Sequence, residues 1–127
     1  MNKQSKQPIS KIQRLIWKEC RRIADTLYKP DCYTCNAKNL QGVNKQLGHV
    51  PYPKSILGAF LKYDMRYLRW QCYSCNINKG GMGATAYKRM SKEQGKKFME
   101  QLEKDRQKTV KAYDYYLELL EKYKSIK

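Results

Sequence analysis

Negative charge is scarce in this sequence. Its 127 residues include 11 Asp and Glu against 27 Lys and Arg, which gives a formal net charge of +16 at pH 7. Such an excess indicates a polyanionic partner, with nucleic acid as the first expectation and an acidic membrane surface as the second.

Long hydrophobic runs are also missing. The longest uncharged apolar run covers residues 56–61, far short of the roughly 20 residues that a membrane helix needs. The first twenty residues are polar and basic, so we expect no secretory signal. These absences predict a cytoplasmic protein without a membrane partner.

Histidine occurs only once, and this excludes several zinc chemistries. A Cys2His2 finger needs two histidines, and a zinc peptidase needs the pattern HExxH. A zinc deaminase needs His-x-Glu, whereas His49 is followed by Val50 and Pro51.

The five cysteines include two close pairs, Cys32-x-x-Cys35 and Cys72-x-x-Cys75. An odd cysteine count without a signal peptide favours metal binding in a reducing cell over disulfides. Four thiolates complete a tetrahedral, structural Zn²⁺ site. A thioredoxin-type redox pair is the alternative, but it would need a βαβ context that is missing here. Cys20 falls on an apolar helical stripe, so we expect a buried small hydrophobe there.

The length fits a single domain over 1–127. We expect a flexible tail over 1–9, an N-terminal helical zone over 10–29, a core over 30–90 and a C-terminal helical region over 91–127. Apolar spacing predicts an amphipathic helix over 11–28, with Ser10 as its cap. Short strands are expected over 46–50 and 68–72, and a loop over 78–83.

Two features are expected in the C-terminal region. Ser91 with Gln94 gives a second capping pattern, and the charged run over 103–108 predicts a break or bend. An apolar stripe follows at helical spacing, formed by Tyr113, Tyr116, Leu117, Leu120 and Tyr123. Such a stripe is typical of core contacts or of contacts with a partner helix. The second alternative predicts a homodimer or a helical adaptor.

His49 and Asn76 are the candidate catalytic residues. A neutral imidazole can act as general base on water, and an amide oxygen is a suitable ligand for Mg²⁺. Both residues belong to the segment that holds the two cysteine pairs, within a very basic chain. The alternative for a lone histidine is a hydrogen-bonded structural role.

Several of these residues together resemble a known family. The order Cys32-x-x-Cys35, Gly48-His49, Tyr63-Asp64, Gln71-Cys72-x-x-Cys75-Asn76 and Lys79-x-Gly81 resembles the phage NinG (Rap) recombination nucleases. That family belongs to the HNH, or ββα-metal, superfamily. The resemblance implies an α+β fold: a zinc-stapled HNH-like core flanked by an N-terminal helix and C-terminal helices.

The resemblance also implies roles for single residues. His49 would be the general base, and Asn76 would hold a catalytic Mg²⁺ or Mn²⁺. Asp64 matches an acidic position of the family and is a candidate second metal ligand; the alternative is an ion pair with Arg66 or Arg69. Tyr67 stands where family members usually carry the asparagine that orients the histidine.

Basic residues occur in every zone, and they predict a surface that follows DNA phosphates. The candidates are Lys18, Arg21, Arg22, Lys62, Arg66, Arg69, Lys79, Lys88 and Arg89. Trp17 and Trp70 are expected in the core rather than stacked on bases.

These expectations combine into one predicted function. The chain is expected to be a metal-dependent endonuclease that cuts branched or single-strand-containing DNA, such as a Holliday junction, D-loop or flap. The setting implied is phage recombination or replication, in the cytoplasm of an infected or prophage-carrying bacterium. The alternatives are a catalytically inactive, zinc-containing DNA-binding module and a helical adaptor of a recombination complex.

Overall fold

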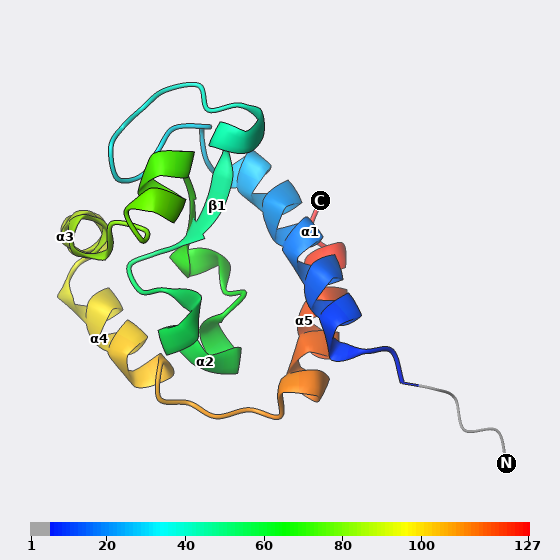
Figure 1. The fold of residues 1–127 in the computed structure, drawn as a ribbon. Coiled ribbons are helices and arrows are strands. Elements are labelled where there is room, and N and C mark those ends of the chain that lie inside the picture. Colours follow the sequence, from blue (N-terminus) through cyan, green and yellow to red (C-terminus); the bar gives the residue numbers. More distant parts are fainter. Residues whose placement is uncertain (1–5) are drawn as a thin grey trace, which may run out of the picture.

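The fold is mainly helical and has one small sheet. It is known from a computed structural model that describes residues 6–127 (Figure 1). The longer helices are α1 (Ile9–Leu27), α2 (Lys54–Leu61), α3 (Gly83–Gln94), α4 (Lys96–Asp105) and α5 (Ala112–Lys124). The strands are β1 (Gln46–His49) and β2 (Leu68–Gln71), and the short helical turns are η1 (Gly42–Asn44), η2 (Met65–Tyr67) and η3 (Ser74–Asn78). None of the helices within residues 6–127 is long and apolar enough to cross a membrane.

The sheet consists of β1 and β2, which pair in antiparallel fashion. Gln46 lies opposite Gln71, and His49 lies opposite Leu68. Both strands were predicted, and each ends one residue earlier than expected. The connection between them contains α2, which the sequence did not predict. This helix is short, and Gly58 inside it has a positive φ of 72°, so its pattern carries little helical signal.

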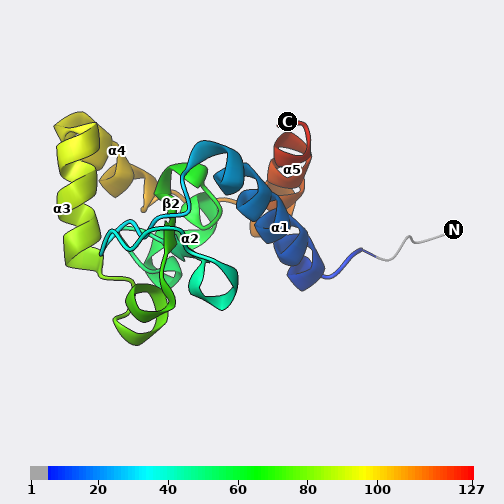
Figure 2. The same ribbon diagram turned by 90° about the horizontal axis from the view of Figure 1, so that it is seen from above.

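Two hydrophobic clusters form the core. The first joins α1 and α5 to one face of the sheet, and it includes Ile16, Leu120 and Trp70. The second joins α2, α3 and α4, and it includes Leu57 and Met90. Viewed from above, α3 and α4 lie at one end of the molecule and α1 and α5 at the other, with the sheet between them (Figure 2).

Helix α1 confirms the predicted N-terminal helix but begins earlier. Ser10 does not cap it, because the N-cap is Pro8, whose carbonyl accepts from the N–H groups of Lys11 and Ile12. Pro8 itself is not helical, with ψ of 142°, but its carbonyl accepts the first hydrogen bonds, so the helix begins at Ile9, before Ser10. Of the tail predicted over 1–9, residues 1–5 lie outside the described part, and Ile9 already belongs to α1.

The C-terminal region differs from the prediction in its boundaries. Ser91 lies inside α3, and the helix boundary falls at Gly95, whose φ of 88° suits glycine best. Helix α4 then ends at Asp105, within the charged run where a break was expected. The apolar stripe of α5 packs against α1 in the same chain, although Leu117 stays exposed. This packing confirms the core alternative for most of the stripe.

Candidate metal centre and histidine site

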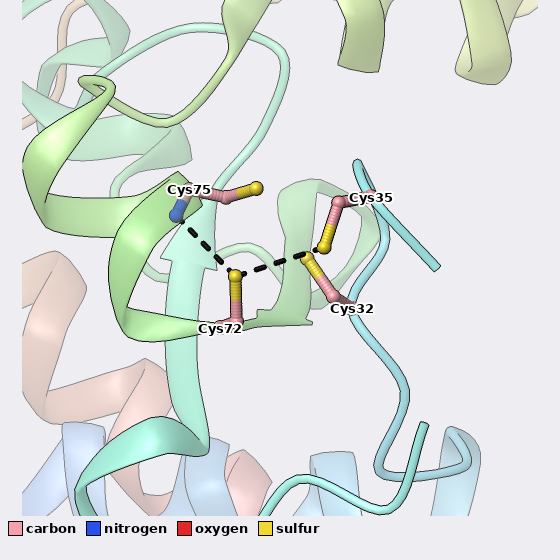
Figure 3. Close-up of side chains that lie close together, drawn as sticks. All are labelled: Cys32, Cys35, Cys72 and Cys75. Atoms are coloured by element: carbon pink, nitrogen blue, oxygen red, sulfur yellow. Dashed lines mark hydrogen bonds between the residues drawn. The ribbon is translucent and has the colours of Figure 1, made fainter. Parts of the chain in front are cut away.

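Four cysteines converge from two separate segments. Cys32 and Cys35 lie in the loop that follows α1, whereas Cys72 follows β2 and Cys75 lies on η3. Their four sulfur atoms lie within 4.8 Å of one another. Figure 3 shows the four side chains converging from the two segments. The two cysteine pairs therefore bring the loop after α1 against the segment that follows β2.

The cluster fits a tetrahedral metal ion. A Zn–S distance of ~2.3 Å implies sulfur–sulfur edges of about 3.8 Å, and the Cys35 and Cys72 sulfurs are 3.7 Å apart. The Cys75 N–H donates to the Cys72 sulfur at 3.4 Å. Burial raises the pKa of the Cys32 thiol, but hydrogen bonds from backbone N–H groups and from Thr34 outweigh it and lower that pKa to about 6. These four residues can hold a metal ion such as zinc.

His49 ends β1 and is held by two contacts. Its Nε2 lies 2.8 Å from the Lys62 carbonyl oxygen, and its ring stacks on Trp17 with centroids 5.4 Å apart and planes 14° apart. A carbonyl only accepts, so Nε2 must carry the proton in the neutral ring. Nδ1 is then left with a free lone pair.

The environment of His49 favours the neutral ring. Burial lowers the pKa of His49 below its ordinary value of 6.5, and the positive charges of Lys54 and Lys62 lower it further. The hydrogen bond to the Lys62 carbonyl acts in the opposite direction but does not reverse the shift. The imidazole is therefore unprotonated at neutral pH and able to accept a proton.

The backbone that carries the Lys62 carbonyl is held in place by hydrogen bonds to the next residue, Tyr63. The carbonyl of Tyr63 accepts a hydrogen bond from the Tyr123 hydroxyl at 2.6 Å and one from the Cys20 thiol at 3.8 Å. Cys20 is fully buried, as predicted, and burial raises its pKa to about 12, so it stays a thiol. Helices α1 and α5 thus fix the segment that orients His49.

Asn76 lies on η3 and faces the strand that carries His49. Its Nδ2 donates to Gln46 Oε1 at 2.9 Å. Its Oδ1 points at Gly48, where a Cβ atom would come within 2.8 Å of it and within 2.1 Å of Gln71 Oε1. Only glycine fits at position 48, because any side chain would displace these two amides.

The amide of Gln71 is unusual. Its Nε2 donates to the Gly81 carbonyl at 2.8 Å and to Thr34 Oγ1 at 3.1 Å. Its Oε1 is buried and has no hydrogen-bond partner within the described residues. A buried oxygen without a partner is costly, so a retained one calls for an explanation.

His49 and Asn76 line one hollow of about 390 Å³, which we call the Asn76 hollow. Its other lining residues are Trp17, Leu47, Pro53, Lys54, Ile77, Gly80 and Gly81. The structure therefore brings the two principal candidates together. Asp and Glu are absent from this lining.

Asp64 is not part of this arrangement. Its two carboxylate oxygens accept from the Arg66 guanidinium at 3.0 and 2.8 Å, and one of them also accepts from the Arg66 backbone N–H. Of the two alternatives left open by the sequence, the structure has the ion pair with Arg66. The expected role of Asp64 as a second metal ligand has no geometric support.

Tyr67 does not take over the histidine-orienting role either. Its side chain is fully buried in the second cluster beside Phe98, and its hydroxyl has no partner within the described residues. The Lys62 carbonyl holds His49 instead.

Four of the nine predicted DNA-binding residues are engaged within the protein. Arg22 pairs with Glu19 and donates to the Tyr123 carbonyl, and Arg66 pairs with Asp64 and Asp105. Arg69 is almost fully buried and donates to three backbone carbonyls, and Arg89 pairs with Glu93. The others, Lys18, Arg21, Lys62, Lys79 and Lys88, form no ion pair within residues 6–127.

Sequence reasoning missed two residues of the site. Trp17 was assigned to the core, yet it also stacks on His49. Lys54 was not singled out, although it lines the Asn76 hollow. Neither contact leaves a local signal, because both depend on how distant segments fold together. The motif Gln71-Cys72 did mark Gln71, but not its contact with Gly48.

The chain was also compared with known proteins. No protein-family model, no curated protein and no solved structure matches it.

Proposed function

We propose that this protein is a metal-dependent DNA endonuclease of the HNH type, related to the phage NinG recombination nucleases. The observation that carries the proposal is the pairing of His49 and Asn76 in one hollow, with Nδ1 of a neutral His49 free to accept a proton. An HNH-like core is supported by the order of the elements: the antiparallel pair β1–β2 is followed by η3. The cysteine cluster joins this unit to the loop after α1.

The proposed reaction uses His49 as general base. A water molecule gives its proton to Nδ1 as its oxygen attacks the phosphorus, and the bond to the leaving oxygen breaks. The Nε2–H bond to the Lys62 carbonyl keeps the ring in the required tautomer and orientation and stabilises the imidazolium that forms.

The site offers a hard cation a small donor set. Asn76 lines the hollow together with His49, and its Oδ1 is an amide oxygen of the kind that Mg²⁺ accepts as a ligand. Mg²⁺ keeps several waters and often takes the rest of its ligands from substrate phosphates, so few protein ligands suffice. Asn76 would hold Mg²⁺ or Mn²⁺ here, and the ion would supply stabilisation of the charge that develops on the phosphate oxygens.

The choice of substrate rests on charge and on the family resemblance. A net charge of +16, with free lysines in each zone, favours a polyanion that is held by its backbone. The resemblance adds branched DNA, phage recombination or replication, and the cytoplasm of the bacterial host.

A second candidate is a zinc-containing DNA-binding module without catalysis. The absence of an acidic side chain from the lining of the Asn76 hollow favours it, as does the burial of Tyr67 away from His49. An adaptor or homodimer formed through α5 gains no such support, because most of the α5 stripe already packs on α1.

Cleavage assays distinguish the first two candidates. A Holliday junction, a flap and plain duplex are incubated with the protein in Mg²⁺, Mn²⁺ or EDTA. We expect nicking that requires the metal and that falls roughly 10²- to 10⁴-fold in His49→Ala. Because the base must be neutral, the cleavage rate should rise with pH through the pKa of His49 and be constant above it. Since that pKa is lowered, the plateau should begin before the pH reaches 6.5.

The matched control lies on the same turn as Asn76. Asn76→Ala should lose cleavage, whereas Asn78→Ala, which changes an exposed residue of η3, should retain it. Tight DNA binding without cleavage in any metal would overturn the nuclease and leave the binding module.

A further inference from the structure

A second hollow lies beside His49. We call it the Arg14 hollow; its volume is about 420 Å³, within the range of small-ligand pockets. Its lining residues are Ser10, Gln13, Arg14, Trp17, His49, Lys54, Lys62 and Tyr63. They come from α1, from the end of β1, from the start of α2 and from the segment after α2, so distant parts of the chain build the hollow.

The Arg14 hollow is lined by positive charges that no acidic side chain within residues 6–127 neutralises. Arg14, Lys54 and Lys62 line it, and none of the three forms an ion pair in the described part of the chain. The acidic side chains are engaged elsewhere: all but Asp114 and Glu118 form ion pairs with other cations, and these two lie on α5 outside the lining. Three free cations around one concave space make a site for an anion.

Two of these cations, Lys54 and Lys62, lie close to the imidazole. Lys54 and Lys62 both act on His49 through their charge, and His49 is neutral in their presence. An anion in the hollow would therefore meet no negative charge and would lie against the ring of His49. Trp17, His49 and Lys54 line both this hollow and the Asn76 hollow, so the two hollows are neighbours.

The walls of the hollow are not only charged. The rings of Trp17 and Tyr63 meet edge to face at 6.2 Å and form an apolar side. A free inorganic anion gains nothing from such a wall, whereas a phosphodiester with its attached sugar does. The combination of three cations with an aromatic wall fits a group of a nucleic-acid backbone.

We propose that the Arg14 hollow binds the phosphodiester group that neighbours the cleaved phosphodiester in the DNA. The hollow would in this way hold the substrate against His49. This subsite rests on the proposed nuclease function and makes it more specific. Two of its three cations, Arg14 and Lys54, were not among the residues predicted to bind DNA. Helix α1 thereby becomes part of the substrate site and not only of the core.

The single histidine provides a direct test. Dimethyl phosphate, a phosphodiester that does not titrate in this range, is added to the protein in metal-free buffer. The one imidazole is then followed by NMR, with sodium chloride at equal ionic strength as reference. We expect dimethyl phosphate to shift the His49 signals and to raise its apparent pKa, because a bound anion favours the imidazolium.

Two matched triple variants decide where the anion binds. Arg14→Gln with Lys54→Gln and Lys62→Gln should abolish the shift. Lys92→Gln with Lys97→Gln and Lys104→Gln removes the same charge from exposed positions on α3 and α4, at the other end of the molecule (Figure 2), and should preserve it. An unchanged shift in the first variant, or no shift in the wild type, overturns the proposal.

Junction DNA gives a second readout that does not depend on the stability of the triple variant. Arg14→Gln alone, an exposed change on α1, should make the dependence of log K on log salt shallower by up to ~0.9 in EDTA. An unchanged slope counts against the subsite. Binding of dimethyl phosphate without DNA cleavage would refute the proposed nuclease function and support the subsite. DNA cleavage without the NMR shift would support the nuclease function and refute the subsite.

Discussion

At the scale of single residues, Gly48 determines the geometry of the candidate site. Two amide oxygens occupy the space that a Cβ atom would need, one from β2 and one from η3. A side chain at this position would separate the strand of His49 from Asn76. Glycine at position 48 is therefore required by the packing, in addition to being part of the Gly48-His49 motif.

Replacement of this residue tests that reading. Gly48→Ala places a Cβ atom 2.1 Å from Gln71 Oε1 and 2.8 Å from Asn76 Oδ1. Overpacking of this kind costs ~1–3 kcal/mol of the free energy of unfolding, measurable by urea denaturation. In a double-mutant cycle, Gln71→Ala should reduce the penalty because it removes the nearer oxygen. Purely additive effects of the two changes would contradict the contact.

At the scale of elements, the cysteine cluster joins the loop after α1 to β2 and η3. Neither segment is long enough to hold itself in place, since β2 has four residues and η3 has five. A metal ion that binds all four sulfurs therefore fixes Asn76 relative to the strands. Folding of this region is expected to depend on the metal.

Metal analysis tests the metal site formed by the four cysteines. The purified protein should hold one zinc per chain, and Cys72→Ser should lose it together with the thermal stability of the fold. Cys20→Ala is the matched control, because Cys20 is a buried thiol outside the cluster. A wild-type protein without bound zinc, or a Cys72→Ser variant that is as stable as the wild type, contradicts the zinc site.

The elements also show how far the sequence could predict the fold. The strands and the cysteine pairs were recognisable because their patterns are local. The helix starts were misplaced because the conformations of Pro8 and Gly95 outweighed the capping patterns at Ser10 and Ser91. Asp64, Trp17 and the Lys62 carbonyl could not be assigned, since their partners depend on tertiary contacts rather than on spacing.

At the scale of the whole molecule, positive charge dominates and much of it remains free. The arginines engaged within the fold leave free lysines on α1, after η3 and on α3, as well as the three cations of the Arg14 hollow. A polyanion can therefore contact several elements at once. Recognition of backbone and shape is expected rather than the reading of bases.

This distribution predicts steep salt dependence. For duplex DNA, log K should fall against log salt by ~0.9 for each phosphate that the protein neutralises. Fluorescence anisotropy with labelled DNA in EDTA, over a series of salt concentrations, measures the slope. A shallow slope would argue against the DNA assignment altogether.

The hydrogen bond from Tyr123 to the Tyr63 carbonyl links folding of the site to the order of protein synthesis. The two residues are 60 positions apart, so at ~5–20 residues per second the ribosome needs roughly 3–12 s to add the second after the first. Until then α5 cannot cover α1, and the segment that orients His49 lacks this support. A nascent chain would therefore contain both His49 and Asn76 before the segment that orients His49 is held in place.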